Sequence, residues 1–368
     1  MAEVDFLERI QGPLMLYPNR VRSFYRGGAM IDLFTKGEKG EDSYFPEDWL
    51  GACFEPKRPG AVPGEGLGCV AVEQVRVRLI DLINVAPDLI LGQKQYELFG
   101  AVPSVLVKLL DAGERLPVHC HPNRQFASEH LKSRFGKTES WAIIALREGL
   151  EKASIWLGFK DGVTPKDFME LITKQDSKAI LDACNEYQIK PGDIIYVPAG
   201  LPHAIGKGIL LLEPQEPSDY SILAEYLNFG TTSHDASLGL GWDTALQAFN
   251  FDTKPANVLE EDLIKRTVFG AGTFNGVSRI LESEFFVVER FEANEGPLEI
   301  SRDFLWTGIV LNGKGSIKST HGVSLAVKKG VCFVVPAFAE SISIEPTEEP
   351  IEILAVLPGD SSMRGDDT

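Results

Sequence analysis

The sequence is short of positive charge. It holds 36 Lys and Arg against 53 Asp and Glu in 368 residues, which leaves a formal net charge of −17. A protein that binds nucleic acid generally needs a basic surface to replace the counterions of the phosphates, so this composition argues against that class of partner. It also disfavours an anionic small substrate, unless positive charge gathers locally around a binding site.

Cysteine and long apolar runs are scarce as well. The cysteines are few and scattered, and no two of them form a Cys-x-x-Cys pair, so they do not indicate a disulfide framework. They are Cys53, Cys69, Cys120, Cys184 and Cys332. No stretch approaches the ~18 apolar residues of a membrane span, and the first residues lack the pattern of a signal peptide. We therefore expect a soluble, cytoplasmic protein with no membrane partner, whose oligomeric state the sequence leaves open.

Short segments of alternating hydrophobicity make up most of the chain. Residues 1–100 are rich in Gly and Pro, and we expect short strands and long connections there, with VRVRLIDLI at 75–83 as one of the apolar runs. Residues 139–159 predict two strands joined by a polar turn. Thr164, followed by Pro and an acidic residue in the first turn, predicts the N-cap of a helix.

Two histidine-containing segments carry the chemistry. His119 and His121 are two residues apart in an alternating segment, so on a strand both rings project from one face and Cys120 from the other. Such a pair can chelate a cation, although two ordinary strand histidines would look the same. Residues 192–203 read Gly-x5-Pro-x-Gly-x2-His, which matches the second sequence motif of the cupin barrels at every fixed position and ends at His203.

Longer strings resemble the type I phosphomannose isomerase family, also called mannose-6-phosphate isomerases. They are VLVKLLDAGERLPVHCHPN (105–123), FGKTESWAIIAL (135–146) and PGDIIYVPAGLPHAIGKGILLLEPQEPSD (191–219), with the predicted helical insert between the last two. The resemblance covers residues 100–225 closely and the N-terminal region more loosely, around 47–49. It implies a metal-dependent aldose–ketose isomerase that interconverts mannose 6-phosphate and fructose 6-phosphate through an enediol or enediolate.

The resemblance also implies a set of site residues. His121, Glu139 and His203 fall on the family's metal ligands, and His119 stands where the family has a glutamine. Three imidazoles and one carboxylate suit Zn²⁺, with Fe²⁺ or Mn²⁺ as alternatives. Two further positions match the family's catalytic residues. These are Lys137, which could polarise sugar oxygens, and Glu213, which could move the proton; each could also be an ordinary structural residue.

One position departs from the family pattern. Ser218 and Asp219 lead in the family to an active-site arginine, but Leu223 stands at that place here. The loss of a permanent cation would slow the reaction or weaken the hold on a phosphate, unless another cation replaces it. Two alternatives therefore stay open at this stage: an isomerase for a different sugar, phosphorylated or not, and a non-catalytic sugar-binding or regulatory cupin.

The predicted fold is mainly β, with two cupin (jelly-roll) barrels and a helical insert and linker. We expect a metal-binding cupin domain at 1–230, with a helical insert at about 162–187. A helical segment at 231–275, a second cupin barrel at 276–360 and a disordered tail at 361–368 should follow. The second barrel repeats the spacing of the first motif at 330–341, but Phe338 and Ser341 replace its second glycine and its histidine, so no metal is expected there. The other histidines, His130, His234 and His321, are expected at the surface.

Overall fold

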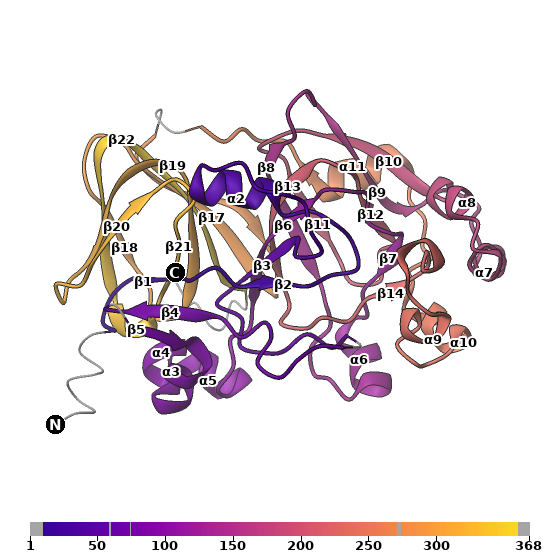
Figure 1. Cartoon of the computed structure of the whole chain (residues 1–368), viewed down its shortest axis with the longest axis horizontal. Helices are drawn as coiled ribbons and strands as arrows, with labels where there is room; N and C mark the ends of the chain where they lie inside the picture. Colours follow the sequence, from indigo (N-terminus) through magenta and orange to yellow (C-terminus); the bar gives the residue numbers. More distant parts are fainter. Residues whose placement is uncertain (1–9, 59, 74, 271–273, 360–368) are drawn as a thin grey trace.

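The computed structural model describes residues 10–58, 60–73, 75–270 and 274–359. It is mainly β, and three sheets follow one another across the molecule in Figure 1: the C-terminal sheet on the left, a seven-stranded sheet in the centre and a five-stranded sheet on the right. The predicted disordered tail at 361–368 lies outside the described residues. Among the described residues, no helix is long and apolar enough to cross a membrane.

The seven-stranded sheet lies between two apolar layers. Its strand order is β15-β11-β8-β13-β6-β3-β2, and each pair of neighbouring strands is antiparallel. All seven residues of β6 are buried, because side chains that alternate along a strand meet apolar neighbours on both faces. The strands are β2 (Arg20–Val21), β3 (Glu47–Leu50), β6 (Leu106–Ala112), β8 (Glu139–Leu146), β11 (Ile194–Val197), β13 (Ile209–Gln215) and β15 (Ile264–Lys265).

The five-stranded sheet packs on one face of the seven-stranded sheet. Trp141 and Leu211 from the larger sheet meet Ile155 and Leu157 from the smaller one in a shared, fully buried cluster. The two sheets therefore form a sandwich whose interior can enclose a site. In the order β10-β9-β12-β7-β14, the smaller sheet's strands are β10 (Cys184–Ile189), β9 (Ala153–Phe159), β12 (His203–Ile205), β7 (His119–Cys120) and β14 (Ile222–Leu223).

Helices cover the outer face of the five-stranded sheet. Cys120 and Ala204 from its strands pack in one cluster with Phe168 and Ile172 of α7. Helix α7 begins at Pro165 with Thr164 as its N-cap, as the sequence predicts, since the Thr164 hydroxyl accepts a hydrogen bond from the Asp167 backbone N–H. The helices on this side are α7 (Pro165–Lys174), α8 (Ser177–Asp182), α9 (Ser233–Ala236), α10 (Trp242–Ala245) and the 3-10 turns η1 (Leu227–Phe229) and η2 (Leu246–Ala248).

The C-terminal half forms a single extended antiparallel sheet in the order β1-β21-β19-β22-β17-β16, with β18 added to β22 and β20 to β19. Strand β1 comes from the other end of the chain and pairs with β21. The strands are β1 (Leu14–Met15), β16 (Gly276–Glu282), β17 (Phe286–Ala293), β18 (Leu298–Ser301), β19 (Trp306–Ser319), β20 (Ser324–Lys328), β21 (Cys332–Val335) and β22 (Ser341–Pro358), and η3 (Ala337–Ala339) lies between the last two.

The first hundred residues are more helical than the sequence predicts. The run at 75–83 is not one strand: β5 ends at Arg78 and α3 begins at Leu79. Leu79, Leu82 and Ile83 lie one helical turn apart and are buried, so burial of this face selects the helix. The elements here are β4 (Cys69–Val72), β5 (Val75–Arg78), α2 (Ala29–Lys36), α3 (Leu79–Val85), α4 (Pro87–Leu91) and α5 (Gln93–Phe99). Helices α6 (Arg124–Leu131) and α11 (Ala256–Leu263) follow later in the chain.

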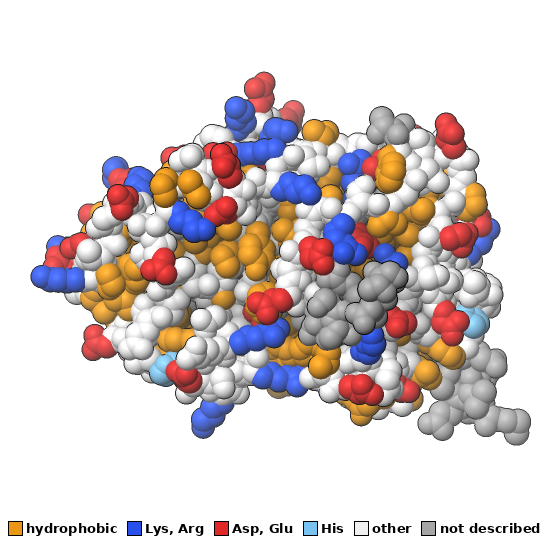
Figure 2. Space-filling model, turned by 180° about the vertical axis from the view of Figure 1, so that it is seen from behind, with side chains coloured by type: hydrophobic (Ala, Val, Ile, Leu, Met, Phe, Trp, Pro, Cys, Tyr) orange, Lys and Arg blue, Asp and Glu red, His pale blue; other side chains and the backbone are white. Residues whose placement is uncertain are grey.

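Charges of both signs share the surface. On the face shown in Figure 2, acidic and basic side chains are interspersed around small apolar areas and do not form a patch of one sign. The large negative net charge is therefore spread out on this face. It says little about the potential inside the sandwich, where a few buried charges dominate.

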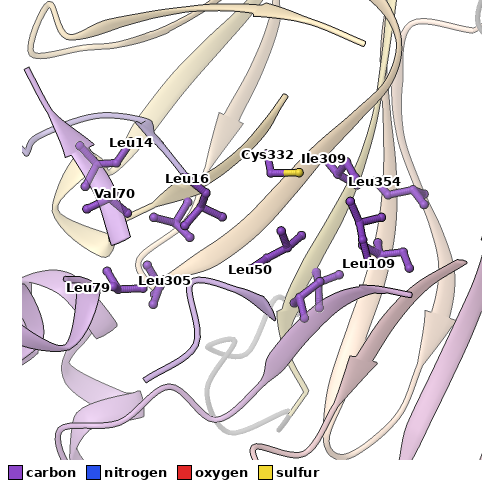
Figure 3. Close-up of a cluster of buried hydrophobic side chains, with 14 of the residues drawn as sticks. Leu14, Leu16, Leu50, Val70, Leu79, Leu109, Leu305, Ile309, Cys332 and Leu354 are labelled. Carbon is purple, nitrogen blue, oxygen red and sulfur yellow. The ribbon is translucent and has the colours of Figure 1, made fainter. Parts of the chain in front are cut away.

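The outer face of the seven-stranded sheet packs against the C-terminal sheet. Leu109 of β6 meets Ile309 of β19 and Leu354 of β22 in the large apolar cluster of Figure 3. The residues flanking Leu109 point the opposite way, because side chains alternate along a strand. This packing therefore fixes which residues of β6 face the interior of the sandwich.

Replacing Leu109 by Ala tests this interface. Leu109 is fully buried, so the variant should lose about 2–5 kcal/mol of unfolding free energy through lost apolar burial and a cavity. Denaturant unfolding measures the loss. The matched control is Leu33→Ala on α2, whose side chain is 55% exposed, and it should stay close to the parent protein. Equal stabilities of the two variants would contradict the packing described here.

Candidate metal centre and active site

Three histidines from the five-stranded sheet meet inside the sandwich. His119 lies on β7, His121 follows that strand, and His203 begins β12, where it pairs directly with His119. Their ring centroids are 4.1–4.9 Å apart and one nitrogen from each ring lies within 4.8 Å of the others. The structure thus brings together the three histidines that the sequence singles out, in the one such cluster found among the described residues.

Backbone carbonyl groups orient all three rings. Each Nδ1 lies 2.8 Å from a carbonyl oxygen and donates its proton there, which leaves Nε2 as the unprotonated atom of every ring. The acceptors are the carbonyl oxygens of Pro117, Tyr220 and Leu201 for His119, His121 and His203. The buried Nε2 of His203 has no hydrogen-bond partner among the described residues. A cation at the centre of the three rings would satisfy it.

Burial keeps these imidazoles neutral. Burial lowers the pKa of His121 to about 3, and the neighbouring Lys137 lowers it further. Burial also lowers the pKa of His203 to about 3, and the neighbouring His121 adds to that effect. Burial, followed by the neighbouring His203, also lowers the pKa of His119 well below its ordinary value. Neutral imidazole is the form that binds a metal ion, so the rings are ready to act as ligands over the whole neutral range of pH.

Glu139 faces the histidines from the opposite sheet. It begins β8, and its Oε2 lies 3.1 Å from His121 Nε2 and its Oε1 3.5 Å from His203 Nε2. The Trp141 indole donates to Oε1 at 2.9 Å and the Lys137 ammonium donates to Oε2 at 2.6 Å. Burial alone would raise the pKa of Glu139, but Lys137 and His121 outweigh it and hold the pKa well below its ordinary value.

These four side chains fit a divalent cation. Three unprotonated nitrogens and one ionised carboxylate are a donor set that suits Zn²⁺, Fe²⁺ or Mn²⁺. The Lys137 ammonium already lies 2.8 Å from His121 Nε2 as well as 2.6 Å from Glu139 Oε2, so two of the four donors face a positive charge. Other protein groups also hold these donors in place, since every ring Nδ1 donates to a backbone carbonyl group and both oxygens of Glu139 accept hydrogen bonds.

Lys108 and Glu213 extend the cluster along the seven-stranded sheet. They are direct cross-strand partners on β6 and β13, and Lys108 Nζ lies 3.3 Å from Glu213 Oε1. Lys137 Nζ lies 3.9 Å from the same oxygen. The two residues that the sequence assigns to catalysis are therefore close to one another and to Glu139.

Lys108 and Glu47 were not singled out as site residues from the sequence. Lys108 Nζ lies 3.4 Å from Glu47 Oε2 and 5.0 Å from the centre of the Trp49 ring. Glu47 accepts hydrogen bonds of 2.8 Å from the Tyr25 hydroxyl and from the Trp49 indole. A lone lysine in the otherwise apolar run VLVKLL was the signal that could have identified Lys108, because a lysine is rarely fully buried without a charged partner.

The pKa of Glu213 is raised to about 7. Burial is the largest cause and the negative charge of Glu139 adds to it, while Lys108 and Lys137 act in the opposite direction. Glu213 Oε1 makes no hydrogen bond within the described structure, in spite of the two ammonium groups nearby. A carboxylate that has an oxygen without a hydrogen bond and a pKa near neutrality is suited to accept and return a proton.

Comparison with known proteins gives the family. No family model matches the chain. A curated relative described as probable mannose-6-phosphate isomerase GmuF, from Bacillus subtilis (strain 168), is 30% identical over 253 residues, which are 68% of this chain and 74% of the relative. The putative mannose-6-phosphate isomerase YvyI of the same organism is 28% identical over 351 residues, 92% of this chain and 97% of the relative. The chain belongs to the type I mannose-6-phosphate isomerase family. The sequence predicts a sugar isomerase, which is an intramolecular oxidoreductase. The names of the homologues confirm this prediction.

Solved structures of the mannose-6-phosphate isomerase family share the fold. A putative mannosephosphate isomerase from Archaeoglobus fulgidus matches with a TM-score of 0.72 at 20% identity, over 95% of this chain and 98% of that one. The mannose 6-phosphate isomerase from Bacillus subtilis matches with a TM-score of 0.67 at 23% identity, over 94% and 99%. These matches confirm the mainly β, cupin-like fold.

The departure from the mannose-6-phosphate isomerase pattern is visible in the structure. Leu223 lies on β14 directly opposite His119, is 5% exposed and belongs to the apolar cluster beneath the helices. No cation therefore enters the site from this position. The histidines predicted at the surface do not join the cluster: His130, His234 and His321 are all exposed, and the His130 ring also contacts Phe126 on α6.

Removal of one imidazole tests the metal centre. His203→Ala removes one of the four metal donors and leaves three. Loss of a residue that only supports a metal ligand weakens metal binding by up to about 100-fold, so we expect the loss of a ligand itself to lower the affinity for Zn²⁺ by more than about 100-fold. Calorimetric titration with Zn²⁺ measures this. His234→Ala, at an exposed position, is the control and should bind like the parent protein. Unchanged affinity in His203→Ala would exclude this residue as a ligand.

Proposed function

We propose that the protein is a metal-dependent aldose–ketose isomerase that interconverts mannose 6-phosphate and fructose 6-phosphate. The observation that carries this proposal is the contact between Glu213, a carboxylate with a pKa near neutrality, and the two lysines beside a donor set for a cation. Isomerisation of an open-chain sugar needs a base that moves a proton between adjacent carbons and positive charge that stabilises the oxygens. The homologues named mannose-6-phosphate isomerase support the same class of reaction.

The metal would be held by His119, His121, His203 and Glu139. We propose Zn²⁺, with Fe²⁺ or Mn²⁺ able to use the same ligands. When bound, a divalent cation supplies Lewis acidity that polarises a carbonyl or hydroxyl oxygen. His119, at the position of a glutamine in the family, adds an imidazole nitrogen and so favours a borderline metal over a hard one.

Glu213 would act as the base. Its Oε1 takes the proton from C2 of the aldose as the electron pair of that C–H bond forms the C1–C2 double bond of an enediol or enediolate and the carbonyl electron pair moves to O1. The same carboxyl group then returns the proton to C1, while the hydroxyl proton of O2 is transferred to O1, so that C1 ends as an alcohol and C2 as the ketone with no net gain or loss of protons. Lys137, 3.9 Å from Glu213 Oε1, would stabilise the negative charge that develops on the sugar oxygens.

Burial assists both steps. Glu213, Lys137 and Glu139 are each less than 5% exposed, so little water competes for the transferred proton or screens the charges. The local balance also makes an anionic substrate acceptable, since two buried lysines and a metal would offset the acidic groups around them. A small sugar phosphate is thus the proposed partner, and neither nucleic acid nor a membrane is expected. The cytoplasmic location stays a prediction.

Turnover on metal-defined protein tests the proposed function. Protein loaded with Zn²⁺ should convert mannose 6-phosphate to fructose 6-phosphate in a coupled assay. Chelation should abolish turnover, and added Zn²⁺ should restore it. Full turnover by metal-free protein would disprove the metal requirement, and a metal-loaded protein that converts neither hexose phosphate would disprove the substrate assignment.

The pH dependence tests the role of Glu213. A base works only when ionised, so kcat/KM should fall as the pH falls through the pKa of Glu213, which is about 7 in the absence of a metal ion, above the ordinary 4.5, and which a bound cation would lower. Glu213→Gln should lower kcat by about 10²–10⁴ and remove this acid limb. The exposed Glu170→Gln on α7 is the control and should keep the parent profile.

Metal content has to be followed in the same pH series. His121 and His203 have pKa values of about 3, so loss of the metal should begin far below the acid limb. An acid limb that persists in Glu213→Gln, or one that tracks metal loss, would contradict the assignment of Glu213 as the base.

A further inference from the structure

A cavity of about 220 Å³ opens beside the proposed active site. Its walls are the loop after β3, the segment before β6, the residues before β8 and the loop between β13 and β14. Most of the lining is apolar, including Phe54, Leu106 and Phe135. Two charged side chains line it among the described residues, Lys57 and Asp219.

Strand register places this cavity in line with the metal donors. Leu106, which lines the cavity, pairs with Gln215 on β13, and Gln215 pairs with Glu139 on β8. Cross-strand partners share a face, so Leu106 and Glu139 face the same interior two strand spacings apart, roughly 10 Å. The extended carbon chain of an open hexose phosphate can span that distance.

Tyr220 connects the cavity to the histidine cluster a second way. Its carbonyl oxygen accepts the hydrogen bond from His121 Nδ1, and its hydroxyl accepts one of 2.5 Å from Lys57 Nζ. The Lys57 ammonium also lies 4.8 Å from the centre of the Tyr220 ring. One residue thus contacts a proposed metal ligand with its backbone and the lysine of the cavity with its side chain.

Lys57 is held in place without being neutralised. The Asp219 carboxylate accepts a hydrogen bond from the backbone N–H of Lys57, which fixes the loop and not the ammonium. No carboxylate of the described residues lies within ion-pairing distance of Lys57 Nζ. A positive charge without a counter-ion at the wall of an apolar cavity is a site for an anionic group.

We propose that Lys57 binds the phosphate of the substrate, together with the hydroxyl of Tyr220. The inference rests on the proposed function and assigns the specificity of the same site. Lys57 would supply the positive charge that Leu223 does not, from a loop about 160 residues earlier in the chain. The sugar carbons would then lie between this anchor and the pair of Glu213 and Lys137.

Steady-state kinetics with mannose 6-phosphate and with mannose test this assignment. Lys57→Gln should raise KM for the phosphorylated sugar by about tenfold to a hundredfold, with kcat little changed, because it removes binding that ground state and transition state share. KM for mannose should not change. Lys57→Arg should recover most of the loss, since it restores the charge.

Lys178→Gln is the matched control, because Lys178 is an exposed lysine of α8 whose ion pair with Asp182 lies outside the cavity. It should behave as the parent protein. Equal changes in KM for both sugars in Lys57→Gln would mean that Lys57 only shapes the cavity, and no change for either sugar would mean that the phosphate binds elsewhere. Both results overturn the proposal.

A binding measurement separates this proposal from the proposed function. Calorimetry should show that the parent protein binds fructose 6-phosphate more tightly than fructose. The ratio of these two affinities should be at least about tenfold smaller in Lys57→Gln. A parent protein that converts neither sugar would disprove the isomerase assignment while this measurement still decides the role of Lys57. Equal affinity of parent and Lys57→Gln for fructose 6-phosphate would overturn the phosphate site whatever the turnover.

Discussion

The structure depends on a chain of alternating charges buried inside a β-sandwich. Glu47, Lys108, Glu213, Lys137 and Glu139 follow one another with at most 3.9 Å between opposite charges. A single buried charge costs several kcal/mol, so each group is tolerated only because its neighbours have the opposite sign. With Glu213 ionised, the three carboxylates exceed the two ammonium groups by one negative charge. A divalent cation beside Glu139 would reverse that sign and favour an anionic substrate.

The two sheets contribute different chemistry to this interior. The five-stranded sheet supplies neutral imidazoles, which backbone carbonyl groups orient through Nδ1. The seven-stranded sheet supplies the charged residues, which its packing against the C-terminal sheet holds in one register. Leu109 and its neighbours on the outer face therefore act on the site indirectly, because a shift of β6 by one residue would turn Lys108 away from Glu213. The C-terminal half stabilises the N-terminal half in this way without contributing a residue to the proposed metal site.

Local sequence patterns predicted the parts of the site that lie close together in the chain. The His-x-His spacing, the Gly-x5-Pro-x-Gly-x2-His motif and Lys137 two residues before Glu139 all depend on a strand or a turn, so their geometry follows from the alternation of side chains. The cap at Thr164 was predictable for the same reason. The family resemblance then added Glu213, and the structure places it beside Lys137.

Contacts between distant segments could not be predicted in this way. Glu47 and Tyr25 join the buried polar groups, and Lys57 lines the neighbouring cavity, from loops and short strands whose position depends on tertiary packing. The helix at Leu79 is selected by burial of one face, although its sequence begins with a strand-like alternation. Strand β1 joins the C-terminal sheet across the whole length of the chain. Leu223 combines both situations. The sequence alone shows that a leucine stands where the family has an arginine, but it does not show which other cation could replace that arginine.

The buried charges and imidazoles together form a donor set for one divalent cation. Anomalous diffraction from crystals of the zinc-loaded protein, recorded at the zinc absorption edge, tests it most directly. We expect a single strong peak among the Nε2 atoms of His119, His121 and His203 and the carboxylate of Glu139. A map without a peak at that place, or with its strongest peak at other residues, would contradict it.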